Sequence, residues 1–111
     1  MAGALIFLVD DDDGSRQAMA RALERVGYEL AAFESAEDAL ARLRGGDRPD
    51  VVISDVRMPG MDGYQLLREI RTDWPDLPFL LVTAFAEVEE AVAALQQGAD
   101  DYLTKPVKMQ E

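Results

Sequence analysis

Acidic side chains gather at two places in this sequence, and both follow short apolar segments. Asp10 and Asp11 begin a run of four aspartates, and Asp55 follows a second apolar segment much later in the chain. Carboxylate oxygens are the ligands that hard divalent cations such as Mg²⁺ prefer. Thr83 and Lys105 each follow a further apolar segment, and they could add a hydroxyl donor and a positive charge. The set therefore suits metal-dependent chemistry on an anionic group, provided that the fold brings these residues together.

Each of these residues also has an ordinary structural interpretation. The aspartates from Asp10 to Asp13 could cap a helix, where carboxylates favour the positive end of the dipole. Asp55 could be a turn residue, Thr83 an ordinary strand residue and Lys105 a surface lysine. Three converging carboxylates would, however, repel one another and resist ionisation unless a cation offset them. Mg²⁺ fits that requirement, because it takes oxygen ligands and keeps several waters.

The elements that must position these residues follow from the apolar pattern. Short apolar runs predict strands at residues 5–9, 29–33, 51–54, 79–82 and 102–104. Spaced apolar residues between the strands predict four helices, with Gly27, the pair Gly45 and Gly46, Pro75 and Gly98 as stop signals. The inward or helix-marking residues are Met19, Leu23 and Val26; Ala36, Leu40 and Leu43; Leu66, Leu67 and Ile70; and Val88, Ala91, Val92 and Leu95.

Alternating strands and helices of this kind predict an α/β fold with a doubly wound, five-stranded parallel sheet. Ligand sites in such sheets lie at the carboxyl ends of the strands. Asp10 and Asp11 end the first predicted strand, and Asp55, Thr83 and Lys105 end the third, fourth and fifth. We therefore expect all of them at one edge of the sheet.

Four segments carry a resemblance to a known family. VDDDDGSR, PDVVISDVRMPGMDG, LLVTA and DDYLTKPV resemble, in this order and spacing, the receiver domains of two-component response regulators, over residues 4 to 107. SDVRMPGMDG together with PDLPFLLVTA is similar to receivers of the nitrogen-regulation (NtrC) type, which are transcriptional regulators. The resemblance implies one receiver domain over residues 1–111, with a flavodoxin-like fold and strand order 2-1-3-4-5.

The resemblance also implies roles for individual residues. Asp55 matches the phosphoacceptor. Asp11 matches the direct metal ligand, Asp10 its acidic neighbour, and Arg57 the position whose backbone carbonyl binds Mg²⁺.

Three more positions match residues that respond to phosphorylation. Thr83 matches the hydroxyl that follows the phosphoryl group, Lys105 the lysine that pairs with it, and Tyr102 the aromatic that reorients on activation. The face around the fourth helix and fifth strand would then change and control an output.

Other function classes fit the residues less well. A phosphatase of the haloacid dehalogenase type needs an acid two positions after its aspartate nucleophile, where this chain has Arg57. A nucleotide or flavin module would have a glycine-rich loop after the first strand, where this chain has DDDDG. A pseudo-receiver would lack acceptor or metal residues, and Asp10, Asp11 and Asp55 are all present. The resemblance thus implies a signalling domain rather than an enzyme, with at most slow self-phosphorylation and self-dephosphorylation.

The composition of the chain disfavours some classes of binding partner. The net charge of −11, from 22 acidic and 11 basic residues, disfavours direct contact with nucleic acid or an anionic membrane. No apolar run approaches the roughly 20 residues that span a bilayer. The chain has no cysteine and starts without a basic leader, which fits a cytoplasmic protein.

The resemblance implies several partners. They are a sensor histidine kinase, a second copy bound through the fourth helix and fifth strand, and a C-terminal output region with ATPase and DNA-binding domains. The chain ends at Glu111, where the family's final helix would begin, so we expect that helix to be largely missing. Apolar surface near the first helix and the fifth strand should then lie open.

Overall fold

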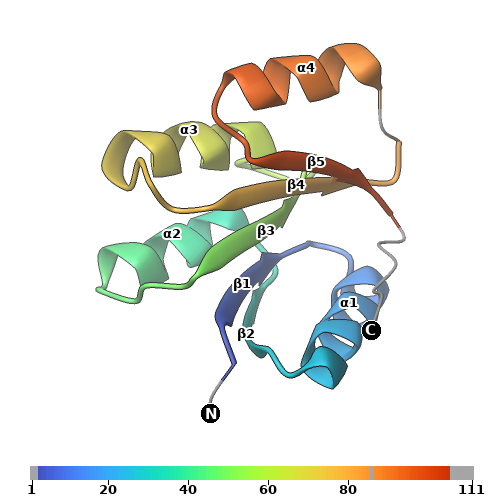
Figure 1. Ribbon diagram of the computed structural model, residues 1–111, viewed down its shortest axis with the longest axis vertical. Helices are drawn as coiled ribbons and strands as arrows, with labels where there is room; N and C mark the ends of the chain where they lie inside the picture. The colour runs from blue at the N-terminus through green and yellow to red at the C-terminus, as the bar shows by residue number, and fades with distance from the viewer. Residues whose placement is uncertain (1–2, 86, 106–111) are drawn as a thin grey trace.

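A computed structural model describes residues 3–85 and 87–105, which form a five-stranded parallel sheet between helices (Figure 1). The strand order is β2-β1-β3-β4-β5, as expected. The strands are β1 (Leu5–Val9), β2 (Glu29–Phe33), β3 (Val51–Asp55), β4 (Phe79–Thr83) and β5 (Asp101–Thr104). The prediction was correct for β1 and β2, and β3, β4 and β5 are each one residue longer than predicted. The expected final helix concerns residues outside this description.

Four helices connect the strands and begin and end where the sequence signals indicate. They are α1 (Asp13–Val26), α2 (Ala36–Arg44), α3 (Gly63–Asp73) and α4 (Val88–Gln96). The Ser35 side chain caps α2 by accepting a hydrogen bond from the Asp38 N–H. Gly27 ends α1 with a φ of 111°, in the left-handed region that favours glycine. Within the described residues, no helix is long and apolar enough to cross a membrane.

The sheet is buried on both faces, which explains why its strands are apolar throughout. Phe7 and Val9 point into a core shared with α2, α3 and α4, whereas Ile6 and Leu8 point into a second core shared with α1. Figure 1 shows α1 on one side of the sheet and the other three helices on the opposite side. The two cores therefore fix the face to which each strand residue points, and the parallel pairing brings the strand ends to one edge.

Two helices carry apolar side chains that face solvent. The sequence places Val26 on one face with Met19 and Leu23, but Val26 is 44% exposed, whereas Leu23 is buried and Met19 packs against the core. In α4, Val88, Val92 and Leu95 are exposed and Ala94 is the buried residue. The pattern therefore predicted the helix correctly while its larger apolar side chains face solvent.

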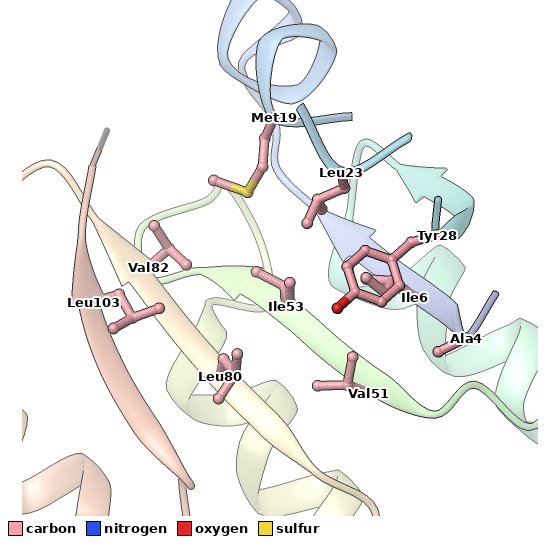
Figure 2. Close-up of a pocket in the computed structure, with 10 residues that line it drawn as sticks. All are labelled: Ala4, Ile6, Met19, Leu23, Tyr28, Val51, Ile53, Leu80, Val82 and Leu103. Atoms are coloured by element: carbon pink, nitrogen blue, oxygen red, sulfur yellow. The ribbon is translucent and has the colours of Figure 1, made fainter. Parts of the chain in front are cut away.

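An apolar cavity of about 400 Å³ opens beside α1 and the sheet. Figure 2 shows side chains from α1, β1, β3, β4 and β5 converging on it. Its lining consists of Ala4, Ile6, Met19, Leu23, Tyr28, Val51, Ile53, Leu80, Val82 and Leu103.

The start of α3 packs closely against the end of β3. The Gly63 N–H donates to the Val56 carbonyl at 2.8 Å, and the Asp62 side chain caps the helix. A Cβ atom at Gly63 would clash with the Asp55 carbonyl oxygen and would lie 2.8 Å from Leu81 Cδ2. The absence of a side chain at Gly63 therefore lets α3 approach the strand that carries Asp55.

We predict that Gly63→Ala lowers the free energy of unfolding by about 1–3 kcal/mol, the usual cost of overpacking. Urea denaturation followed by circular dichroism measures the loss. Gly14→Ala in α1 is the control, because a Cβ there meets Asp12 Oδ2 at an ordinary 3.6 Å. The control should be neutral or stabilising by up to about 1 kcal/mol. Equal stabilities of Gly63→Ala and the wild type would contradict the prediction.

Candidate functional site

The carboxyl ends of four strands meet at one edge of the sheet, and backbone hydrogen bonds extend the pairing into this region. Asp10 follows β1, and its N–H donates to the Phe33 carbonyl at 3.1 Å. Asp55 ends β3 and Thr83 ends β4, and the Lys105 N–H donates to the Thr83 carbonyl at 2.8 Å. The sheet therefore sets the spacing of the side chains at this edge.

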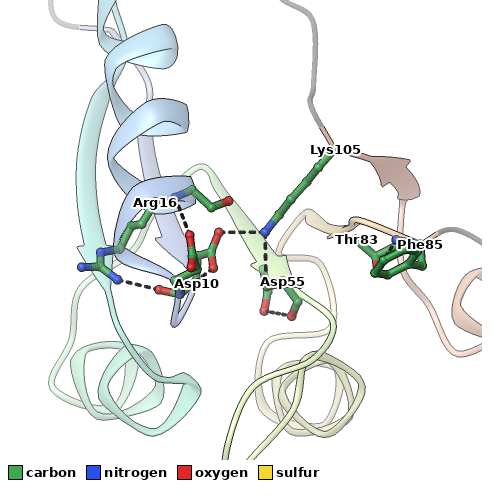
Figure 3. Close-up of polar contacts among 9 residues, drawn as sticks. Asp10, Arg16, Asp55, Thr83, Phe85 and Lys105 are labelled. Atoms are coloured by element: carbon green, nitrogen blue, oxygen red, sulfur yellow. Dashed lines mark hydrogen bonds and ion pairs between the residues drawn. The ribbon is translucent and has the colours of Figure 1, made fainter.

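Lys105 joins the two inner carboxylates. Its Nζ lies 2.9 Å from Asp10 Oδ2 and 3.0 Å from Asp55 Oδ2 (Figure 3). The side chains of Asp10 and Asp55 are only 3% and 13% exposed, and that of Lys105 is 17% exposed. One ammonium group thus offsets two largely buried carboxylates, which leaves this part of the site with an excess of negative charge.

The three groups shift one another's ionisation. Burial raises the pKa of Asp55, and the neighbouring Asp10 carboxylate adds to this, so that Lys105 offsets the increase only in part. Burial also acts against ionisation of Asp10, but hydrogen bonds from the Asp12 N–H, Ser15 and Lys105 outweigh it and lower its pKa. Burial opposes the charged form of Lys105, yet its two carboxylate partners raise its pKa.

Asp10, Asp11 and Asp55 can each offer one carboxylate oxygen, and these oxygens lie within 4.8 Å of one another. Their donor set consists of oxygens, which is what Mg²⁺ requires. Asp11 is exposed, so water can complete the coordination of an ion held there. The residues therefore fit a Mg²⁺ ion. That ion would share Asp10 and Asp55 with the Lys105 ammonium.

The structure also explains the remaining aspartates of the first loop. Asp12 is the N-cap of α1, since its carboxylate accepts a hydrogen bond from the Ser15 N–H at 2.7 Å. Asp13 pairs with Arg16, whose guanidinium also donates to the Asp10 carbonyl at 2.8 Å. Capping, the role predicted for these aspartates, is confirmed for Asp12. Arg16 as a support for the Asp10 backbone was not predicted, because a helix arginine has no distinctive signal in the sequence.

Thr83 lies at the same edge but turns away from the carboxylates. Its side chain is buried, and its hydroxyl oxygen accepts a hydrogen bond from the Phe85 N–H at 3.3 Å. Figure 3 shows Thr83 to one side of the group formed by Asp10, Asp55 and Lys105. Thr83 therefore contacts the loop before α4 in this arrangement.

The Arg57 and Tyr102 side chains both contact Glu90, a residue of α4 that was not predicted. The Arg57 guanidinium lies 3.2 Å from Glu90 Oε1, and the Tyr102 hydroxyl lies 3.4 Å from Glu90 Oε2. The Tyr64 hydroxyl completes this group, at 3.4 Å from that of Tyr102. No sequence motif identifies Glu90 or Tyr64, because their meeting depends on how α3, α4 and β5 pack.

Comparisons with known proteins agree with this geometry. The family model for the response regulator receiver domain matches residues 6–111. The chain is 48% identical over 105 residues to the C4-dicarboxylate transport transcriptional regulatory protein DctD of Rhizobium meliloti (strain 1021), covering 95% of this chain and 23% of that protein. It is 43% identical over 111 residues to the DNA-binding transcriptional regulator NtrC of Salmonella typhimurium, covering 100% of this chain and 24% of that protein. A structure of the chemotaxis protein CheY4 of Vibrio cholerae matches with a TM-score of 0.88 at 32% identity, covering 96% of this chain and 90% of that one.

The chain belongs to the response regulator receiver domain family. It is a phosphoacceptor domain of two-component signalling, and its relatives fit the NtrC-type resemblance seen in the sequence. It spans less than a quarter of the length of the two regulators named above.

We predict that Lys105→Ala binds Mg²⁺ as well as the wild type or up to about tenfold more tightly. The substitution removes a competing cation, and a unit charge at this range is worth on the order of 1 kcal/mol in water. The same variant should be impaired in phosphorylation or in its readout. Isothermal titration with Mg²⁺ measures the affinity. Arg25→Ala removes an equal charge from the exposed end of α1 and is the control. A large loss of Mg²⁺ affinity in Lys105→Ala would show that Lys105 does not compete with Mg²⁺ for the carboxylates.

Proposed function

We propose that Asp55 accepts a phosphoryl group from the phosphohistidine of a sensor histidine kinase. The observation that carries this proposal is the convergence of Asp55 with Asp10 and Lys105 at the carboxyl edge of the sheet. A carboxylate oxygen of Asp55 attacks phosphorus, the phosphorus–nitrogen bond breaks, and the imidazole leaves with its electron pair. The product is an aspartyl phosphate, a mixed anhydride formed on a side-chain nucleophile.

The residues that would hold Mg²⁺ are Asp10, Asp11, Asp55 and the backbone carbonyl of Arg57. When bound, the ion supplies positive charge against the oxygens of the phosphoryl group. Lys105 supplies a second positive charge from the protein itself, and its ammonium already contacts the acceptor carboxylate at 3.0 Å. The carboxylates of the cluster repel one another. Their excess negative charge therefore favours binding of a cation, which reduces this repulsion.

Thr83 and Tyr102 form the switch. A phosphoryl group on Asp55 offers new acceptor oxygens, and Thr83 can donate to them once its hydroxyl turns from the Phe85 N–H. This movement frees space next to β5, into which Tyr102 can turn. The face formed by α4 and β5 then changes its contacts, so that a local charge biases a two-state element.

The output of the switch is transcription in this proposal. The relatives are named as transcriptional regulators, and they are much longer than this chain. We therefore place residues 1–111 as a cytoplasmic receiver domain that precedes an output region with ATPase and DNA-binding domains. The receiver itself makes no contact with nucleic acid or membrane, because its net charge is −11. It acts as a signalling domain whose self-phosphorylation and self-dephosphorylation are slow at most.

Incubation with acetyl phosphate and Mg²⁺ should add one phosphoryl group to the wild type, detected by mass spectrometry of the intact protein. Asp55→Asn should remain unlabelled, since an amide oxygen is a poor nucleophile, and EDTA should abolish labelling. Asp13→Asn, which removes an exposed carboxylate beside the site, is the matched control and should label fully. Labelling of Asp55→Asn, or full labelling in EDTA, would disprove the proposal.

The exposed apolar side of α4 supports a homodimer through α4 and β5. Phe85, Val88, Val92 and Leu95 are 78%, 81%, 49% and 47% exposed. Apolar groups exposed next to one another favour association. We propose that phosphorylation changes the dimer equilibrium, because the same face carries the switch.

Sedimentation at high micromolar concentration, with and without beryllofluoride, tests the dimer. Val92→Glu should weaken association at least about tenfold, because it places a charge in the apolar contact. Val26→Glu is the matched control, since Val26 is similarly exposed but lies on α1. If the wild type is monomeric in both states, no such dimer exists.

A further inference from the structure

Glu90 joins three separate parts of the chain at one carboxylate. Its Oε1 atom pairs with the Arg57 guanidinium at 3.2 Å. Its Oε2 atom accepts from the Tyr64 hydroxyl at 3.5 Å and from the Tyr102 hydroxyl at 3.4 Å. Arg57 lies two residues after Asp55, Tyr64 lies in α3 and Tyr102 lies in β5. One side chain of α4 therefore contacts the acceptor loop and the switch aromatic at the same time.

The Arg57 side chain is 70% exposed, but the other three members of the group are partly buried. The Glu90 side chain is 31% exposed, whereas Tyr64 and Tyr102 are half-buried and pack against the core beneath α3 and α4. Burial raises the pKa of Tyr64, and Tyr102 and Glu90 raise it further. The hydroxyl of Tyr64 thus stays protonated and remains a donor. Both carboxylate oxygens of Glu90 already have partners. If Glu90 moved together with Tyr102, it would therefore lose its contact with Arg57 or with Tyr64.

We propose that Glu90 is a positioning residue that latches Tyr102 to α4 and to Arg57, and so opposes the switch that phosphorylation of Asp55 drives. This inference rests on the proposed function of Asp55, Thr83 and Tyr102. Thr83 pairs with Thr104 in the sheet, and Tyr102 lies two residues before Thr104 on the same strand. For Tyr102 to turn into the space that Thr83 leaves, its hydroxyl must separate from Glu90.

The lengths of the contacts suit a latch that opens. Hydroxyl–oxygen distances of 3.4 to 3.5 Å are longer than the roughly 2.7–2.8 Å of a strong bond, so each contact is weak by itself. α4 is also held lightly, because Ala94 is its one buried residue within the described structure. Elements with few buried apolar contacts lie at the low end of local stability. The strength of the Glu90 contacts therefore enters the free-energy difference between the two states directly.

The test measures the affinity of the folded chain for beryllofluoride with Mg²⁺, a mimic of the phosphoryl group, by NMR. Glu90→Gln keeps the shape of the side chain and removes its charge. We expect it to bind roughly fivefold or more tightly than the wild type, as a coupling of this kind allows. Tyr102→Phe removes the latched hydroxyl and should tighten binding to a similar extent. The double variant should bind no more tightly than either single variant, because both substitutions open the same contact.

Glu89→Gln is the matched control. Glu89 is the neighbouring residue of α4, is exposed, and loses the same charge on substitution. Its affinity for beryllofluoride should equal that of the wild type. If Glu90→Gln behaves like Glu89→Gln, or binds beryllofluoride more weakly while its thermal unfolding is unchanged, the latch does not exist. A role in folding alone would lower stability without tightening binding.

A second readout needs no phosphoryl mimic. The chain has three tyrosines, so carbon-13-labelled rings report separately on Tyr28, Tyr64 and Tyr102. In Glu90→Gln the signals of Tyr64 and Tyr102 should move, while that of Tyr28, at the cavity beside α1, should not. Unmoved Tyr64 and Tyr102 signals would overturn the latch. Equal binding of beryllofluoride by the wild type and Asp55→Asn would instead show that Asp55 is not the phosphoacceptor. The tyrosine signals would still report whether Glu90 contacts Tyr64 and Tyr102.

Discussion

The balance of charge at the carboxyl edge of the sheet is the constraint on which the rest of this receiver domain depends. Asp10 and Asp55 are largely buried side by side, and one ammonium group, that of Lys105, contacts both. One cation does not neutralise two buried carboxylates. The remaining negative charge favours the binding of a divalent ion at this edge. The capped start of α1, the Arg16 contact with the Asp10 backbone and the close approach of Gly63 keep these groups in place.

Two helices on the same side of the sheet, α3 and α4, differ in how much of their surface is buried. Four residues of α3 are buried, including Leu66 and Ile70, whereas α4 buries Ala94. The strand that carries Asp55 therefore packs against a well-buried helix, whereas α4, which follows Thr83, buries less of its surface in the core. Elements with few buried apolar contacts lie at the low end of local stability, so α4 can shift at a lower cost in free energy than α3. Under the proposed function, this difference would direct the change toward α4 rather than α3.

Among the described residues, apolar surface is exposed on α4 and beside α1. The side of α4 that carries Val88 and Val92 is exposed, and the same helix carries Glu90. The surface near Leu23 and Leu103 is a cavity of about 400 Å³ beside α1. An exposed apolar helix face of this kind suits the dimer interface proposed above. The cavity belongs to the opposite core, away from Glu90 and Tyr102.

The sequence by itself determined the order and type of the elements, because apolar periodicity and stop signals such as Gly27 are local properties of the chain. It also determined that Asp10, Asp55 and Lys105 share an edge, since parallel strands end on the same side. Only the tertiary structure decided that Lys105 contacts both carboxylates and that Thr83 faces the Phe85 N–H. It also decided which side of each helix is buried, because the space left by neighbouring elements, rather than spacing along the chain, selects the inward residues and their rotamers.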